Sequence, residues 1–436
     1  MEYQASLNDY SGSWPDEPQP KEPLPLSIFL LMPFLIAAVA VAALPGFNYL
    51  VIGLGAVCAV VFLMASVRQG FFVPAELKFF IAFGCWGILG LFSAKSPELV
   101  FTGIRTLTQL VIMALIVSYY SRNTRCVSWL FFAVLIGVLV ISVSAVITGE
   151  FQMAEMEGEK ARLAGIALNA NSFAIAVLEG VAILLYYLRR VWSKTLKLLI
   201  IGGILIAVRF IVASGSRKGF LGLAVLVFFW FLFSYVKEFG KRPILVIVML
   251  LGMVGFGFFM AYQLRDSVLM QRFLRLEGKK GATAEGSATG RMLMIREGVH
   301  MTISNPVLGV GINNFRLHSV TERYAHNNYV EIFADTGIPG GILYHMIYVL
   351  ILYRLYKVSK FPLTPSQRNA VTIFKCLILL RGFLDLGVVS YYSKANWIFL
   401  AIIIGYSSYL MRDFKTAYSQ DYSAGEYDQI ALSPEY

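Results

Sequence analysis

The stretch Val127-SWLFFAVLIGVLVISVSAVI-Thr148 carries no charged side chain over its whole length. An α-helix needs about 20 consecutive apolar residues to cross the hydrocarbon core of a bilayer, which is roughly 30 Å thick. The stretch is long enough to do this. In a bilayer a helix also satisfies its own backbone hydrogen bonds, which an isolated strand cannot do. The sequence therefore predicts a helix that spans a membrane.

Apolar runs of this kind recur about twelve times along the chain. They lie near residues 27–44, 47–67, 77–93, 103–120, 127–148, 171–188, 196–213, 218–236, 243–263, 338–357, 369–389 and 396–411. Of the 436 residues 58% are hydrophobic and only 14% are charged, and the mean hydropathy is +0.68. A soluble domain has roughly 25% charged residues. The predicted fold is an all-α integral membrane protein of about twelve transmembrane helices, with a large external loop that carries short helices.

The Lys and Arg residues of the short loops predict the orientation of the chain, because cytoplasmic loops carry more of both. With the N-terminus inside, the cytoplasmic loops contain Arg68, Lys78, Arg122, Arg125, Arg189, Arg190, Lys194, Lys197, Lys237, Lys241, Arg242, Arg354, Lys357, Lys360 and Arg368. The short external loops contain fewer, namely Lys95, Arg105, Lys160, Arg162, Arg217, Lys218 and Lys394. Both termini are thus predicted to be cytoplasmic. The Lys and Arg residues behind the net charge of +11 are distributed as in a membrane protein. The charge therefore indicates contact with a bilayer and does not indicate a nucleic-acid partner.

This topology divides the chain into five parts. They are a cytoplasmic disordered tail (1–26), a nine-helix transmembrane region (27–263), an external catalytic loop (264–337), a three-helix transmembrane region (338–411) and a cytoplasmic tail (412–436). The first tail is acidic and proline-rich, whereas a signal peptide begins with positive charge. The role of the tyrosines in the second tail is left open.

One helix is predicted inside the external loop. Met292, Ile295, Val299 and Ile303 recur at spacings of three and four residues, which places them in one stripe on a helix. Asn305-Pro306 ends the pattern. We expect this helix to lie at the membrane surface or over a cavity.

Three arginines and one histidine share the predicted external face: Arg162, Arg217, Arg291 and His326. Each has an ordinary explanation as well as a functional one. An arginine at a membrane boundary can extend its charged end to the interface, and one at a helix start can be solvated. A lone surface histidine often has no role in chemistry. The residues alone do not decide between the two.

A family resemblance favours the functional reading. The segments Arg291-MLMIREGVHMTISNPVLGVGINN-Phe315 and His326-NNYVEIFADTGIP-Gly340 resemble those of the O-antigen ligase/polymerase family. So do Ser214-Gly-Ser-Arg217 and Arg162-Leu-Ala-Gly with Asn169-Ala-Asn171. The segments stand in the family's order and cover the second half of the chain. One departure is Ile295, where the family usually has Trp a turn after its Arg.

The resemblance implies a membrane glycosyltransferase of the bacterial inner membrane. Such enzymes move a glycan from an undecaprenyl-diphosphate donor to an acceptor hydroxyl on the outer face. It also implies that Arg217 and Arg291, with Arg162, bind the donor diphosphate, since guanidinium groups neutralise phosphate oxygens with paired hydrogen bonds. His326 would be the general base of an inverting single displacement. The supporting residues would be Lys218, Asn171 and Asn327.

Neither a metal nor a cofactor is expected. The four histidines (His300, His318, His326, His345) are dispersed, and the first external loops contain no paired acidic motif. Glu331 and Asp335, the only carboxylates near His326 in its segment, are predicted to be structural. The four cysteines have no metal-binding or redox spacing.

Two functional questions stay open at this point. A polymerase, which we prefer, joins one lipid-linked glycan to another and works with a chain-length regulator, whereas a ligase passes the glycan to lipid A-core; donor and chemistry are the same. The alternatives of another class are a lipid-linked oligosaccharide flippase and a structural scaffold. A transporter usually shows internal repeats and a central site, and we find no repeat. Neither the sugar and its linkage nor the oligomeric state is predicted.

Overall fold

The computed structural model describes residues 24–40, 47–147, 151–152, 162–163, 169–239 and 288–423. Its helices are α2 (Ser27–Ala40), α3 (Phe47–Gln69), α4 (Ala75–Leu89), η1 (Gly90–Phe92), α5 (Pro97–Tyr120), α6 (Thr124–Ile147), α7 (Ala170–Arg190), α8 (Lys194–Ala213), α9 (Arg217–Phe239), α12 (Ala288–Ser304), α13 (Phe315–His318), α14 (Asn328–Val358), α15 (Pro365–Asp385) and α16 (Lys394–Ser423). Two short strands, β1 (Phe151–Gln152) and β2 (Arg162–Leu163), pair antiparallel.

Eight of the described helices are long and apolar enough to cross a membrane: α3, α4 with η1, α5, α6, α7, α8, α9 and α14. The all-helical membrane fold is therefore confirmed, but the count of twelve is not. The predicted span 243–263 lies outside the described residues. The helix at the first predicted span, α2, has only 14 residues. Helices α15 and α16 cover the last two predicted spans, and α15 carries the polar residues Lys375, Arg381 and Asp385.

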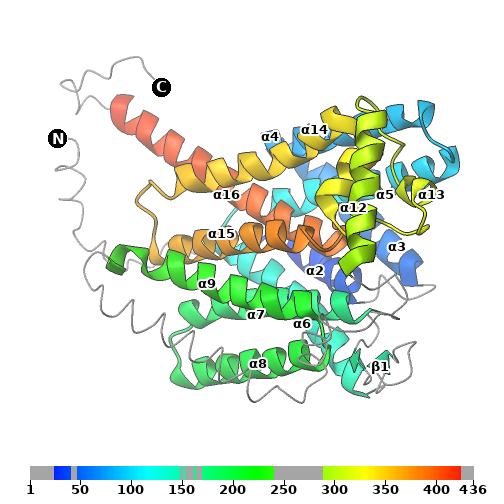
Figure 1. Cartoon of the computed structure of the whole chain (residues 1–436). Helices are drawn as coiled ribbons and strands as arrows, with labels where there is room; N and C mark the ends of the chain where they lie inside the picture. The colour runs from blue at the N-terminus through cyan, green and yellow to red at the C-terminus, as the bar shows by residue number, and fades with distance from the viewer. Residues whose placement is uncertain are drawn as a thin grey trace.

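Helix α12 has a different direction from the long helices. Figure 1 shows α7, α8, α9 and α15 running side by side, with α12 running crosswise to them next to α14 and the end of α15. The expectation that α12 lies at the membrane surface or over a cavity stays a prediction.

The predicted apolar stripe of α12 does not face the protein. Met292, Val299 and Ile303 are 53%, 48% and 72% exposed, whereas Met294 and Met301 are buried. At Gly298 an added Cβ atom would lie 2.2 Å from Val330 on α14. Helix α12 thus packs on α14 through a face that the hydropathy pattern does not mark, because a small residue allows the two helices to approach closely.

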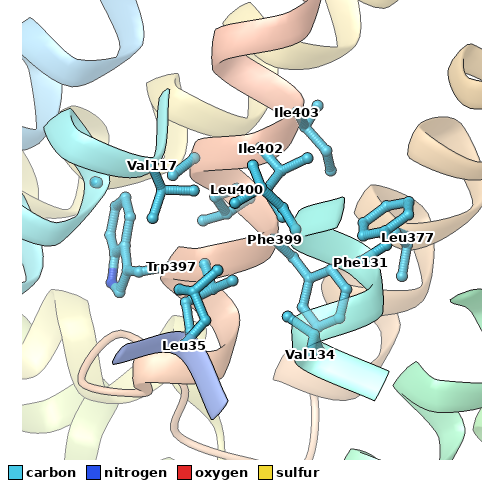
Figure 2. Close-up of a cluster of buried hydrophobic side chains, with 14 of the residues drawn as sticks. Leu35, Val117, Phe131, Val134, Leu377, Trp397, Phe399, Leu400, Ile402 and Ile403 are labelled. Carbon is cyan, nitrogen blue, oxygen red and sulfur yellow. The ribbon is translucent and has the colours of Figure 1, made fainter. Parts of the chain in front are cut away.

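The centre of the bundle is an apolar cluster around α16. Figure 2 shows Trp397, Phe399 and Leu400 of α16 among side chains of α2, α5, α6 and α15. The ring of Trp397 stacks on Phe80 of α4, with 3.4 Å between the ring centroids, and its Nε1 donates to the carbonyl oxygen of Tyr391 at 2.9 Å. The core therefore also holds the connection between α15 and α16, which reaches the candidate site.

Helix α14 bends at Gly337, next to the predicted start of a span at residue 338. Gly337 has φ 68° and ψ −176°, a backbone conformation that only glycine adopts readily. An added Cβ atom would lie 2.2 Å from the carbonyl oxygen of Val307, and Ile338 N donates to the carbonyl oxygen of Pro306 at 2.8 Å. Residues 328–337, which the sequence assigned to the external loop, form the first turns of this helix.

Candidate active site

The turn between α8 and α9 places Arg217 at the start of a helix. Gly215 has φ 61°, which allows the sharp turn, and Ser216 is fully buried. The Ser216 hydroxyl accepts from Gly219 N at 3.2 Å and donates to Asn171 Oδ1 at 2.9 Å. The predicted supporting residue Asn171 therefore holds this turn in place from the first turn of α7.

The other predicted residue on this side, Arg162, lies in β2. Its backbone pairs with Gln152 of β1, and β2 lies against α7 and α8. The side chain of Arg162 lies outside the part of the chain that the structure describes. Its assignment to the donor site stays a prediction.

The two other predicted arginines lie close to a lysine. Lys218 on α9 is within electrostatic range of both Arg217 and Arg291, and all three side chains are half-buried. The ammonium of Lys218 also donates to the carbonyl oxygen of Gly387, beyond the end of α15. The structure thus brings together three cations from α9 and α12, two helices that are far apart in the sequence.

His326 lies beside these cations. Burial, and after it the positive charges of Lys218, Arg291 and Arg323, together lower the pKa of His326 from 6.5 to about 4. The imidazole is therefore neutral at neutral pH and able to accept a proton. Its ring centroid is 4.2 Å from that of Tyr324, whose ring is 46% exposed.

Asn327 has a local structural role. It is the N-cap of α14, and its Oδ1 accepts from Val330 N at 3.1 Å. Helix α14 therefore begins directly after this residue. Burial and the three cations, and not the end of this helix, are the causes of the lowered pKa of His326.

Two buried carboxylates, Glu331 and Asp335, follow the histidine in the chain. Glu331 Oε2 accepts from Ala325 N at 2.6 Å. Asp335 accepts from Asn313 N at 2.9 Å, from Phe315 N at 3.0 Å and from the Tyr391 hydroxyl at 2.7 Å. Both side chains bind backbone groups of the loop segments that precede α14, which agrees with the predicted structural role.

A third buried acid joins α15 to the same region. Asp385 accepts from Asn328 Nδ2 at 3.0 Å and from the Ser390 hydroxyl at 2.5 Å, and Ser390 N donates to Asn328 Oδ1 at 2.9 Å. In the sequence Asp385 stood out only as a charge within a span. We also did not predict a role for Arg323 or Tyr324, although they lie only three and two residues before His326.

The arrangement suits a polyanionic ligand and a proton transfer. Three cations on one face neutralise phosphate oxygens, and the adjacent neutral imidazole accepts a proton. Among the described residues, no group of three or more His, Cys, Asp or Glu side chains is placed to hold a metal ion. The described cations are therefore the groups available to stabilise negative charge here.

Comparison with known proteins finds one family match, which covers part of this region. Residues 202–345 match the family described as O-Antigen ligase. The matched interval contains Arg217, Lys218, Arg291 and His326, whereas Arg162 and Asn171 lie before it. No curated protein matches the chain.

Proposed function

Because residues 202–345 match the family described as O-Antigen ligase, we propose that the chain transfers a glycan from an undecaprenyl-diphosphate donor to an acceptor sugar hydroxyl. The observation that carries the proposal is the convergence of Lys218, Arg291 and Arg323 on a half-buried, neutral His326. This pairing of a phosphate site with a base matches the two needs of the reaction, a stabilised leaving group and a deprotonated nucleophile.

Arg217, Lys218 and Arg291 bind the donor diphosphate. As the bond between the anomeric carbon and the diphosphate oxygen breaks, negative charge accumulates on the phosphate oxygens. Arginine stabilises that charge through two parallel hydrogen bonds, and lysine adds a compact charge. Undecaprenyl diphosphate then leaves without requiring a metal ion, so transfer is expected to continue in excess chelator.

His326 accepts the proton of the acceptor hydroxyl while the hydroxyl oxygen attacks the anomeric carbon. A base with a pKa of about 4 is weak, but that value belongs to the site without donor. The negative charges of the diphosphate offset the positive charges of the cations, and this raises the pKa of His326 towards its ordinary range. Donor binding thus strengthens the base. Attack opposite the diphosphate inverts the anomeric configuration.

The reaction takes place on the external face of the bacterial inner membrane, with both termini in the cytoplasm. The Lys and Arg asymmetry of the short loops supports this orientation. A reporter fused after Gly281 is expected to be active only outside, and one fused after Lys360 only inside. The reverse pattern would contradict the orientation.

The acceptor decides between the two forms of the enzyme. Our sequence-based preference is a repeat-unit polymerase, which would work with a chain-length regulator, whereas the description of the matching family favours a ligase to lipid A-core. The chemistry at His326 is the same in both. Supplying the purified protein with donor and either a second lipid-linked glycan or lipid A-core separates them by which acceptor is consumed.

The test of the proposed function is a transfer assay on the purified full chain. It follows glycan transfer and undecaprenyl diphosphate release together, and it compares His326→Ala with His300→Ala. His300 lies exposed on α12 and makes a matched control. From the wild type and from His300→Ala we expect both products in equal amounts, and from His326→Ala about 10²–10⁴-fold less of both. Near wild-type transfer by His326→Ala would contradict the proposal.

A further inference from the structure

The backbone of His326 adopts an uncommon conformation. Its φ is 54°, in the left-handed region that side chains other than glycine rarely occupy. Such a residue persists only where its surroundings hold it, and these positions concentrate at active sites. The conformation also sets the direction in which the imidazole leaves the chain. Whatever holds this backbone therefore orients the base.

One residue holds the chain on both sides of His326. The carboxylate of Glu331 accepts from Ala325 N at 2.6 Å, one residue before the histidine. The backbone N–H of Glu331 donates to the carbonyl oxygen of Asn327, one residue after the histidine, at 3.1 Å. This is the first hydrogen bond of α14 and depends on the backbone alone, so the contact with Ala325 is the one that needs the Glu331 side chain. Glu331 and Ala325 are both buried, at 6% and 1% exposure, so water does not compete for the carboxylate contact.

A simpler role for Glu331 does not explain this contact. An acidic residue in the first turn of a helix stabilises the helix through its dipole, usually from an exposed position. Glu331 is buried, and its oxygen reaches back to the preceding loop. The neighbouring acid, Asp335, binds different loop residues, Asn313 and Phe315. The charges that act on His326 come from Lys218, Arg291 and Arg323, so the contact of Glu331 with the base runs through the backbone.

We propose that Glu331 is the positioning residue of His326: by fixing Ala325 and Asn327 it holds the left-handed backbone between them and directs the imidazole at the acceptor hydroxyl. This rests on the proposed function. The role depends on the reach of the side chain and on an acceptor oxygen at its end. It does not depend on negative charge.

Two substitutions separate reach from charge. Glu331→Gln keeps the length of the side chain and an oxygen that can accept from Ala325 N, but it removes the charge. Glu331→Asp keeps the charge but is one methylene group shorter, so it cannot reach Ala325 without a shift of the backbone. If Glu331 positions the base, Asp lowers kcat by about 10²-fold, the usual effect of misplacing a reacting group by about 1 Å. Gln recovers most of kcat.

Donor binding and a matched control identify the cause of any loss. The dissociation constant for the undecaprenyl-diphosphate donor is expected to be unchanged in Glu331→Asp, because the cations that bind it are intact. Glu297 on α12 is the control, since its carboxylate also holds loop groups, Val320 N at 3.1 Å and the Ser319 hydroxyl at 2.6 Å, but does not flank His326. Glu297→Asp should leave kcat within a few-fold of the wild type.

The inference is overturned if Gln is as inactive as Asp, if Asp keeps wild-type kcat, or if Glu297→Asp lowers kcat equally. The proposed function is judged separately by His326→Ala. An active His326→Ala variant contradicts the base itself, whereas an inactive one combined with a fully active Glu331→Asp contradicts only the positioning role.

Discussion

Helix α3 and the first turns of α14 differ in the side chains that they expose and bury. The described side chains of α3 are apolar for most of its length, and many are exposed, among them Tyr49 and Val67 at 81% and 85%. The first turns of α14 bury the polar residues Asn328, Glu331 and Asp335, each with a hydrogen-bond partner. Lipid can cover the exposed apolar side chains of α3, and there one apolar residue can replace another. Burying polar groups is costly unless every one is satisfied, so their presence in α14 marks the region that the structure maintains for function.

The difference predicts which substitutions matter, and the largest effect is expected at His326. Replacing it with Ala should reduce transfer by about 10²–10⁴-fold, the usual contribution of a general base. The affinity for the donor should stay the same, because the arginines and Lys218 remain. Separate measurements of donor binding and single-turnover transfer check this. A parallel loss of donor affinity would show that His326 binds the donor and is not the base.

The next effect concerns two arginines on one helix. Arg291→Ala should lower kcat by about 10²–10³-fold, as expected for the loss of one group that stabilises the transition state. Arg296→Ala, five residues later on an exposed face of α12, should have little effect. Arg291→Lys should recover activity only in part, because an ammonium keeps the charge but loses the paired hydrogen bonds. Equal activity in the two alanine variants would show that Arg291 is an interface anchor and does not bind the donor.

Two glycines test the comparison of α3 with α14 directly. Gly337→Ala should destabilise the protein by roughly 1–3 kcal/mol, because alanine is strained at φ 68° and its Cβ would meet the carbonyl oxygen of Val307. Gly53→Ala in α3 meets no atom within 4 Å and should be neutral or slightly stabilising. Thermal unfolding of both variants in the same detergent provides the measurement. Equal melting temperatures of the two variants would contradict this difference between α14 and α3.

A smaller effect is expected in the pH dependence. In the free protein the pKa of His326 is about 4, so kcat/KM for the donor should fall only as the pH drops towards that value. The bound diphosphate raises the pKa of His326, so the acid limb of kcat should lie at a higher pH than that of kcat/KM. Rate profiles at constant ionic strength test this order. Acid limbs in the opposite order would show that the donor does not act on His326.

Much of this organisation could be predicted from the sequence, because hydropathy and charge act locally. The predicted span 171–188 lies within α7 (Ala170–Arg190), and the predicted end of the surface helix before Asn305 is the end of α12 at Ser304. The resemblance assigned Arg217, Arg291 and His326 to one site. In the structure Arg217 and Arg291 lie near Lys218, and Lys218 and Arg291 lie near His326, while the roles of these residues stay predictions.

Other features depend on contacts between distant segments, which no local pattern reports. The contact between Glu331 and Ala325 closes a short loop only when the chain reverses at His326. The outward direction of Val299 follows from the packing of Gly298 on Val330. The apolar period alone could not decide whether this stripe faces protein or lipid.

The most direct measurement is the anomeric configuration of the product formed by the purified chain from a defined undecaprenyl-diphosphate glycan. Nuclear magnetic resonance of the newly formed linkage reads the configuration, and donor and acceptor are supplied in excess chelator. A single displacement with His326 as base predicts a linkage inverted relative to the donor, formed about 10²–10⁴-fold more slowly by His326→Ala. Retention of configuration would contradict that mechanism, and no transfer to either acceptor by the wild type would favour the transport alternative.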